Sequence, residues 1–346
     1  GLDHVKLVKM GILGLSTLYT VKDAYETAKE YDLNVESPSD IYEFLNGYRE
    51  LPREKADRTY GLMAEDPDSC FQLSSPGMKK LLRQIKPKDT EALSAILALY
   101  RPGPINSGMV DAYVNRESFF HGRVADKIKD ILSPTNGVLI YQEQVMKIAE
   151  KIAGYTLGQA DILRRAIGKK KKEDMEAERA NFVLHAVKNG YDEKEANIVF
   201  DAIEKFAGYG FNKSHSMSYS YLAFVTAWYK ANYGPAWTKA NLKTKIKRER
   251  REDVGLYIED AMRFCNVYPA KVIASDKTIG DALDIRLVRQ SGINVSNMES
   301  FWCRNSWALM LGIRDIAGIK DKITGYADMP IPKDMKELLS LCVKYK

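Results

Sequence analysis

Two segments of the sequence combine residue types that favour binding of a polyanion. Residues 164–172 carry six cations in nine positions. Residues 205–216 are rich in glycine and aromatic residues and include Asn212, Lys213 and His215. Phosphate oxygens bind best to charge-assisted donors on a backbone that can approach them closely. A lysine run alone is usually a solvated helix end, but the two segments together predict a phosphate site.

The first segment begins with two adjacent arginines, Arg164 and Arg165. Neighbours on a helix diverge by about 100°, so we expect the pair to flank a polyphosphate from two sides rather than to form one clamp face. Arginine suits this task because its planar donors engage phosphate oxygens in pairs. Asp161 opens the same predicted helix, and we interpret it as a charge complement to the helix N-terminus rather than as a metal ligand.

The second segment leaves two interpretations of His215 open. The bend at residues 208–210 would let the backbone approach a ligand, which favours a binding role, whereas a lone histidine is often structural. Gln142, Glu143 and Gln144 begin another predicted helix. Without an evident partner, we interpret them as a polar face or a capping device.

No catalytic constellation stands out in the sequence. Two-metal phosphoryl transfer needs two or three converging aspartates, and no Asp-x-Asp pair lies beside a predicted strand. No Ser-His-Asp or Cys-His arrangement is evident either. The residue types alone therefore predict a helical domain that binds nucleotide or nucleic acid.

The composition is that of an ordinary globular protein. The 346 residues carry a net charge of +6, which is compatible with nucleic-acid binding without establishing it. Four scattered cysteines lack CxxC spacing, so we expect neither a zinc site nor a disulfide framework. This use of cysteine predicts a reducing, cytoplasmic compartment. No apolar run reaches the roughly 18 residues of a membrane span. The first residues show neither an initiator Met nor a signal peptide, so we expect a fragment or a processed piece.

Hydrophobic periodicity predicts a mainly α fold from residue 16 to residue 236. A short strand is predicted at 5–13, a rigid extended loop at 101–104, and irregular or β-rich structure at 267–307. Residues 312–319 fit the pattern of a helix-hairpin-helix turn. Helices are predicted at 16–31, from 38, and at 78–85, 90–99, 138–153, 158–167, 173–188, 193–206, 218–233 and 254–264.

Several strings resemble the alpha subunit of bacterial DNA polymerase III, a C-family replicative polymerase. They are LYRPGP at 99–104, YQEQVM at 141–146, AGYTLG at 153–158 and KANY at 230–233, together with residues 161–171 and 205–216. The resemblance is collinear from about residue 5 to residue 320. It implies the end of a palm at 1–17 with a short palm-edge strand, a helical fingers domain at 18–236, a divergent distal part at 237–310 and the start of an α+β or helix-hairpin-helix module at 311–346.

The resemblance also implies site residues. The loop at 101–104 would be structural or would face the template. The implied nucleotide-binding residues are Lys9, Arg164, Arg165, Lys169, Asn212, Lys213 and His215, and the implied DNA-binding residues are Arg101, Lys170, Lys171, Gly312, Ile313 and Gly318.

One departure from the family concerns catalysis. The family's palm has an Asp-x-Asp pair in a segment before Gly1, and its third aspartate position is Gly11 here, so no catalytic residue is expected in this chain. The complete enzyme would be a DNA-directed DNA polymerase that uses Mg²⁺. Its implied partners are deoxynucleotide triphosphates and primer-template DNA, with the sliding clamp and other replisome subunits contacted through regions outside this chain. The alternatives are a non-catalytic nucleotide- or DNA-binding relative and a helical interaction scaffold.

Overall fold

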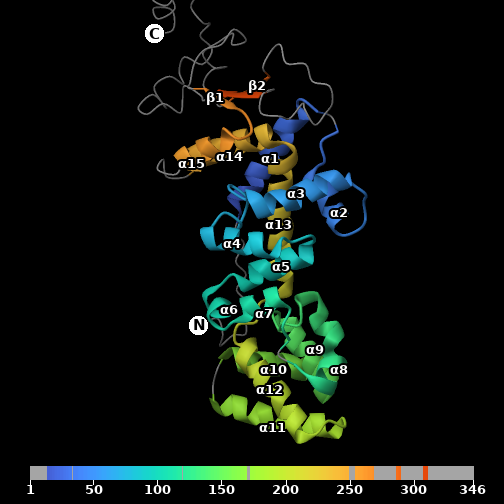
Figure 1. The fold of residues 1–346 in the computed structure, drawn as a ribbon. Coiled ribbons are helices and arrows are strands. Elements are labelled where there is room, and N and C mark those ends of the chain that lie inside the picture. The colour runs from blue at the N-terminus through green and yellow to red at the C-terminus, as the bar shows by residue number, and fades with distance from the viewer. Residues whose placement is uncertain are drawn as a thin grey trace, which may run out of the picture. The chain divides into compact units, whose positions relative to one another are not determined.

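A computed structural model describes residues 14–32, 34–118, 120–169, 172–248, 254–268, 286–289 and 307–310. The chain forms two compact units. We call residues 1–55 with 225–346 the terminal unit and residues 56–224 the central unit. The described ranges are mainly helical, as predicted (Figure 1). None of their helices combines the length and apolar character needed to cross a membrane.

Helices α1 (Ser16–Lys29) and α14 (Gly234–Arg248) pack along each other in the terminal unit (Figure 1). This unit also contains α2 (Pro38–Leu45), α15 (Val254–Ala261) and the C-terminal part of α13 (Lys213–Asn232). Three short strands, β1 (Asn266–Tyr268), β2 (Arg286–Arg289) and β3 (Trp307–Met310), form a sheet of order β1–β3–β2. β3 is parallel to β1 and antiparallel to β2. Most of residues 267–307, for which irregular or β-rich structure is predicted, lies outside the described ranges.

The terminal unit contains a buried ion pair. The ammonium of Lys230 on α13 lies 2.8 Å from Oδ1 of Asp260 on α15, and the two side chains are 0% and 6% exposed. The same ammonium lies over the ring of Phe264, 5.5 Å from its centroid. Buried charges persist only where partners replace water, so this pair fixes how α15 packs on the end of α13.

In the described residues of the central unit, helices are joined by turns and loops, and one isolated β-bridge pairs Tyr141 with Phe211. A hydrophobic core cluster of buried residues in this unit includes Ile148 of α9, Leu163 of α10 and the rings of Phe182 and Phe200. The helices are α3 (Arg53–Glu65, which begins in the terminal unit), α4 (Pro76–Ile85), α5 (Thr90–Leu99), α6 (Pro102–Asn106), α7 (Met109–Asn115), α8 (Gly122–Leu132), a 3₁₀ turn (Ser133–Thr135), α9 (Gln142–Ala153), α10 (Leu157–Lys169), α11 (Lys172–Lys188), α12 (Glu193–Ala207) and the first part of α13.

Three predicted elements differ from the structure. The expected extended loop at 101–104 is wrong, because Pro102 starts α6. Proline suits the first helical turn, where its missing N–H would have no partner. The helix predicted from 138 begins at Gln142, since Tyr141 instead pairs with Phe211. The helix predicted from 218 begins at Lys213, because Oδ1 of Asn212 accepts a 2.8 Å hydrogen bond from the His215 N–H and caps it.

Candidate functional site

Arg164 and Arg165 converge on one carboxylate. Nη2 of Arg164 lies 2.7 Å from Oδ1 of Asp161, and Nη2 of Arg165 lies 2.6 Å from Oδ2. The expectation that the two arginines cannot share one face is therefore wrong for their charged ends. Asp161 precedes them by three and four residues, the two spacings that place side chains side by side on a helix.

Asp161 itself is an ion-pair partner rather than a complement to the helix N-terminus. It is the fifth residue of α10, beyond the first turn in which the helix dipole acts. The hydrogen bond from Arg164, reinforced by the charges of both arginines, holds the pKa of the Asp161 carboxyl below its usual value. The carboxylate is therefore ionised at neutral pH.

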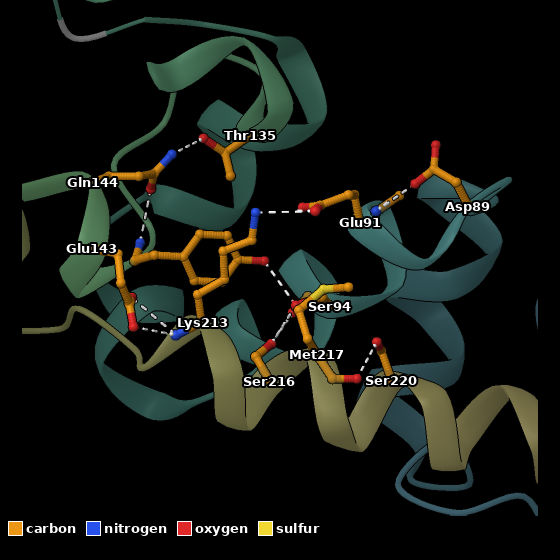
Figure 2. A network of polar contacts seen from close by, with 12 residues as sticks. Asp89, Glu91, Ser94, Thr135, Glu143, Gln144, Lys213, Ser216, Met217 and Ser220 are labelled. Atoms are coloured by element: carbon orange, nitrogen blue, oxygen red, sulfur yellow. Dashed lines mark hydrogen bonds and ion pairs between the residues drawn. The ribbon is translucent and has the colours of Figure 1, made fainter. Parts of the chain in front are cut away.

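The first turn of α9 connects the arginines to the start of α13. Oε1 of Gln142 accepts a 3.3 Å hydrogen bond from Nη1 of Arg164, and its Nε2 donates to the Gly210 carbonyl at 3.3 Å. The carboxylate of Glu143 accepts the backbone N–H of Lys213 at 3.0 and 3.1 Å (Figure 2). It also accepts a hydrogen bond from the Asn212 side-chain amide at 3.0 Å. The two segments identified from the sequence therefore meet through Gln142 and Glu143.

The contacts of Gln142 and Glu143 cannot be predicted from the sequence alone. Gln142 contacts residues 22 and 68 positions away, and Glu143 contacts residues 69 and 70 positions away. Gln144, by contrast, is the capping device that was expected. Its Oε1 accepts the N–H groups of Ile140 and Tyr141 at 2.9 Å each. Its Nε2 donates to Oγ1 of Thr135 at 2.7 Å (Figure 2). This buried amide therefore fixes where α9 begins.

Lys213 is engaged at both its backbone and its side chain. Its ammonium lies 3.0 Å from Oε1 of Glu91 on α5 (Figure 2). The same ammonium lies 5.5 Å from the ring centroid of Tyr141. The Tyr141 hydroxyl contacts Oγ of Ser94 at 2.9 Å, and the same Oγ contacts Oγ of Ser216 at 2.7 Å. Burial raises the pKa of Tyr141, so its hydroxyl stays protonated. The first turn of α13 is thereby attached to α5.

His215 lies in the first turn of α13, as the third residue of this helix. Its exposed ring lies 4.3 Å from the ring centroid of Tyr219 and 5.5 Å from that of Phe211. These aromatic contacts support the structural interpretation of His215, and a nucleotide contact stays a prediction.

Arg101 supports the turn that precedes α13. Its Nη2 donates to the Tyr209 carbonyl at 2.6 Å, its Nε donates to the Ala98 carbonyl at 2.7 Å, and its guanidinium carbon lies 4.5 Å from the Phe211 ring centroid. Burial lowers the pKa of this guanidinium. These contacts support the structural alternative for the 101–104 segment rather than a template contact.

Gly103 lies directly against the ring of Tyr209. A Cβ at this position would be 2.7 Å from Cε1 of Tyr209, inside van der Waals contact. We expect Gly103→Ala to lower the free energy of unfolding by about 1–3 kcal/mol, because the ring and its turn must move. Chemical denaturation followed by far-UV circular dichroism measures this change.

Gly61→Ala in α3 is the matched control, since nothing lies within 4 Å of its added Cβ. It should stabilise the helix by about 0.5–1 kcal/mol. Equal stabilities of Gly103→Ala and the unsubstituted chain would contradict the close packing of α6 against the turn.

A pocket of about 530 Å³ lies between α10, α11 and α12, next to Gly208 and Tyr209. Two carboxylates surround one cation in its wall, because Arg179 lies 2.6 Å from both Asp201 and Glu204. At Asp161, by contrast, two arginines share one carboxylate and keep an excess positive charge, so the arginine pair offers more to a phosphate than Arg179 does.

Several expected site residues fall outside the described ranges or have no described side chain. Lys169 ends α10, but its side chain is not described. In the ranges that are described, no three His, Cys, Asp or Glu side chains come together as metal ligands. The positions outside the described residues are Lys9, Gly11, Lys170, Lys171, Gly312, Ile313 and Gly318, as are the predicted strand at 5–13 and the helix-hairpin-helix pattern at 312–319.

Residues 20–190 match the family model for the bacterial DNA polymerase III alpha subunit finger domain. This range includes the first turn of α9 and the arginine pair. Over 268 residues, which are 74% of this chain, the sequence is 41% identical to the DNA polymerase III subunit alpha of Escherichia coli K12. The chain belongs to the DNA polymerase III alpha family.

Two further DNA polymerase III alpha subunits show the same level of similarity. That of Pseudomonas aeruginosa PAO1 is 40% identical over 281 residues, and that of Vibrio cholerae is 41% identical over 263 residues. They match 78% and 73% of this chain. The chain spans only 22% to 23% of the length of these DNA polymerase III alpha relatives. The resemblance inferred from the short strings is confirmed.

Proposed function

We propose that this chain contributes the fingers of a replicative DNA polymerase and binds the triphosphate of an incoming deoxynucleotide at Arg164 and Arg165. The observation that carries the proposal is the convergence of both guanidinium groups on a single anion, Asp161. Two arginines that can share one carboxylate can also share one phosphate, because both anions offer oxygens that accept paired N–H donors.

The neighbourhood of the pair supports the proposal. Gln142 holds Arg164 from the other side, and Glu143 links this region to Asn212 and Lys213. We propose Lys169, Asn212 and His215 as further contributors to nucleotide binding. Lys213 is a weaker candidate, since Glu91 already pairs with its ammonium.

We also propose that the complete enzyme extends primer-template DNA during replication with Mg²⁺, and that it contacts a sliding clamp through other regions. The described residues do not fit a metal site, since no three potential ligands gather among them. The contribution proposed for this chain is therefore to bind and orient the nucleotide. Arg101 is assigned to supporting the Gly208–Phe211 turn rather than to DNA.

Replacing both arginines tests the proposal. We expect Arg164→Ala/Arg165→Ala to weaken binding of a deoxynucleoside triphosphate such as dATP about 10- to 100-fold, because charge-assisted hydrogen bonds are lost. Isothermal titration of the full chain at low salt measures the change. The affinity of the unsubstituted chain should also fall as salt screens these charges.

Arg123→Ala/Lys127→Ala on α8 is the matched control, because both side chains are exposed and the loss of charge is the same. It should leave the affinity within about twofold, as screening limits distant exposed charges. An equal loss in both double variants, or no loss in the arginine variant, would overturn the proposal.

A further inference from the structure

The arginine pair already holds an anion. Each oxygen of Asp161 contacts a different guanidinium, at 2.7 Å for Arg164 and 2.6 Å for Arg165. Nε of Arg164 adds a second bond at 2.9 Å. A bound phosphate would need these same donors, so it must compete with Asp161 for them.

The contacts of Asp161 suit an anion that can be exchanged. Asp161 is partly exposed, with 28% of its side chain accessible, and Arg165 is 66% exposed. Exposed ion pairs are weak individually, so a multiply charged ligand can replace one. Arg164 is also held by the neutral Gln142, a bond that does not depend on Asp161. When the Asp161 carboxylate is displaced, Arg164 therefore keeps its hydrogen bond to Gln142.

We propose that Asp161 is an exchangeable internal anion, which holds Arg164 and Arg165 at one point in the empty site and is displaced by the nucleotide triphosphate. This inference rests on the proposed function and concerns how that site is regulated. Asp161 acts as a positioning residue before binding and as a competitor during it. Because competition lowers affinity, Asp161 makes the nucleotide easier to release.

Removing the charge of Asp161 tests this exchange. We expect Asp161→Asn to raise the affinity of the full chain for dATP about threefold to tenfold at low salt, because two partly exposed ion pairs no longer compete. Asp161→Glu keeps the anion within reach and should bind dATP about as the unsubstituted chain does. A gain in affinity is informative because damage to the fold would lower it.

Asp130→Asn is the matched control. Its carboxylate pairs with Lys151 at 2.6 Å on α8 and α9, and that bond holds the pKa of Asp130 below its usual value, as Arg164 does for Asp161. Both substitutions add one unit of net charge. Asp130→Asn should leave the dATP affinity within about twofold, since screening limits distant exposed charges.

A nuclear magnetic resonance titration gives a second measurement. The Nε–H resonance of Arg164 should shift in the unsubstituted chain when dATP is added, as its acceptor changes from carboxylate to phosphate. In Asp161→Asn the resonance should already differ before dATP is added. A dATP titration that leaves this resonance unmoved in the unsubstituted chain would overturn the exchange.

The outcomes separate the two proposals. An unchanged or weaker affinity in Asp161→Asn, with a loss in Arg164→Ala/Arg165→Ala, overturns the exchange and leaves the nucleotide site standing. An equal gain in Asp130→Asn also overturns it, because net charge would then explain the effect. Unchanged binding in the arginine double variant overturns the nucleotide site itself.

Discussion

Asp260→Ala should lower the free energy of unfolding of the terminal unit by about 3–5 kcal/mol, because it leaves the ammonium of Lys230 buried without its carboxylate. The two groups lie 2.8 Å apart, and the Lys230 side chain is fully buried. Denaturant unfolding followed by tryptophan fluorescence measures the change, since Trp228 and Trp237 are buried in this unit.

A double variant provides the control for this prediction. Lys230→Met/Asp260→Leu replaces both charges by apolar side chains and should recover most of the lost stability, because neither charge of this pair then remains buried. A loss below about 1 kcal/mol in Asp260→Ala would contradict the buried pair as an important contact between α13 and α15.

Arg101→Ala should lower the free energy of unfolding of the central unit by about 2–4 kcal/mol, because hydrogen bonds from a charged group to the Ala98 and Tyr209 carbonyls are lost. We expect no change in the salt dependence of binding to primer-template DNA. Far-UV circular dichroism in denaturant and a DNA titration at several salt concentrations measure the two effects.

Arg101→Lys separates support of the turn from a DNA contact. Lysine can replace arginine at a single phosphate, but it lacks the planar fork that reaches two carbonyls. If Arg101 has a structural role, Arg101→Lys should lower the free energy of unfolding nearly as much as Arg101→Ala does. Full stability in both variants together with weaker DNA binding would contradict our assignment of Arg101.

The helices predicted best from the sequence are those whose first turn is capped by residues close in the sequence. The helix predicted at 90–99 matches α5, whose first turn is capped by Asp89 through a 2.7 Å hydrogen bond from the Ala92 N–H. The helix predicted at 193–206 matches α12 within one residue, and Asp192 and Glu195 cap each other's backbone N–H groups. Such signals lie within one turn, so they can be recognised without the tertiary structure.

The predictions failed where distant residues decide the local structure. Glu143 is 70 residues from Lys213, and Tyr141 leaves the predicted helix because it pairs with Phe211. No local pattern indicates such partners. The convergence of Arg164 and Arg165 on Asp161, by contrast, depends on spacings of three and four residues that can be read from the sequence. The divergence of adjacent side chains predicts separate partners, but the spacings of three and four residues give both arginines the same partner, Asp161.

The two halves of the candidate site differ in when they can form during folding. The contacts of Asp161 with Arg164 and Arg165 lie within one helical turn of α10, so they can form as soon as this helix does, within about a microsecond. The contact between Glu143 and Lys213 closes a separation of 70 residues and must await tertiary assembly. A partly folded chain would therefore carry its two arginines already paired with Asp161, which halves their net charge and limits their attraction to other polyanions before the rest of the site forms.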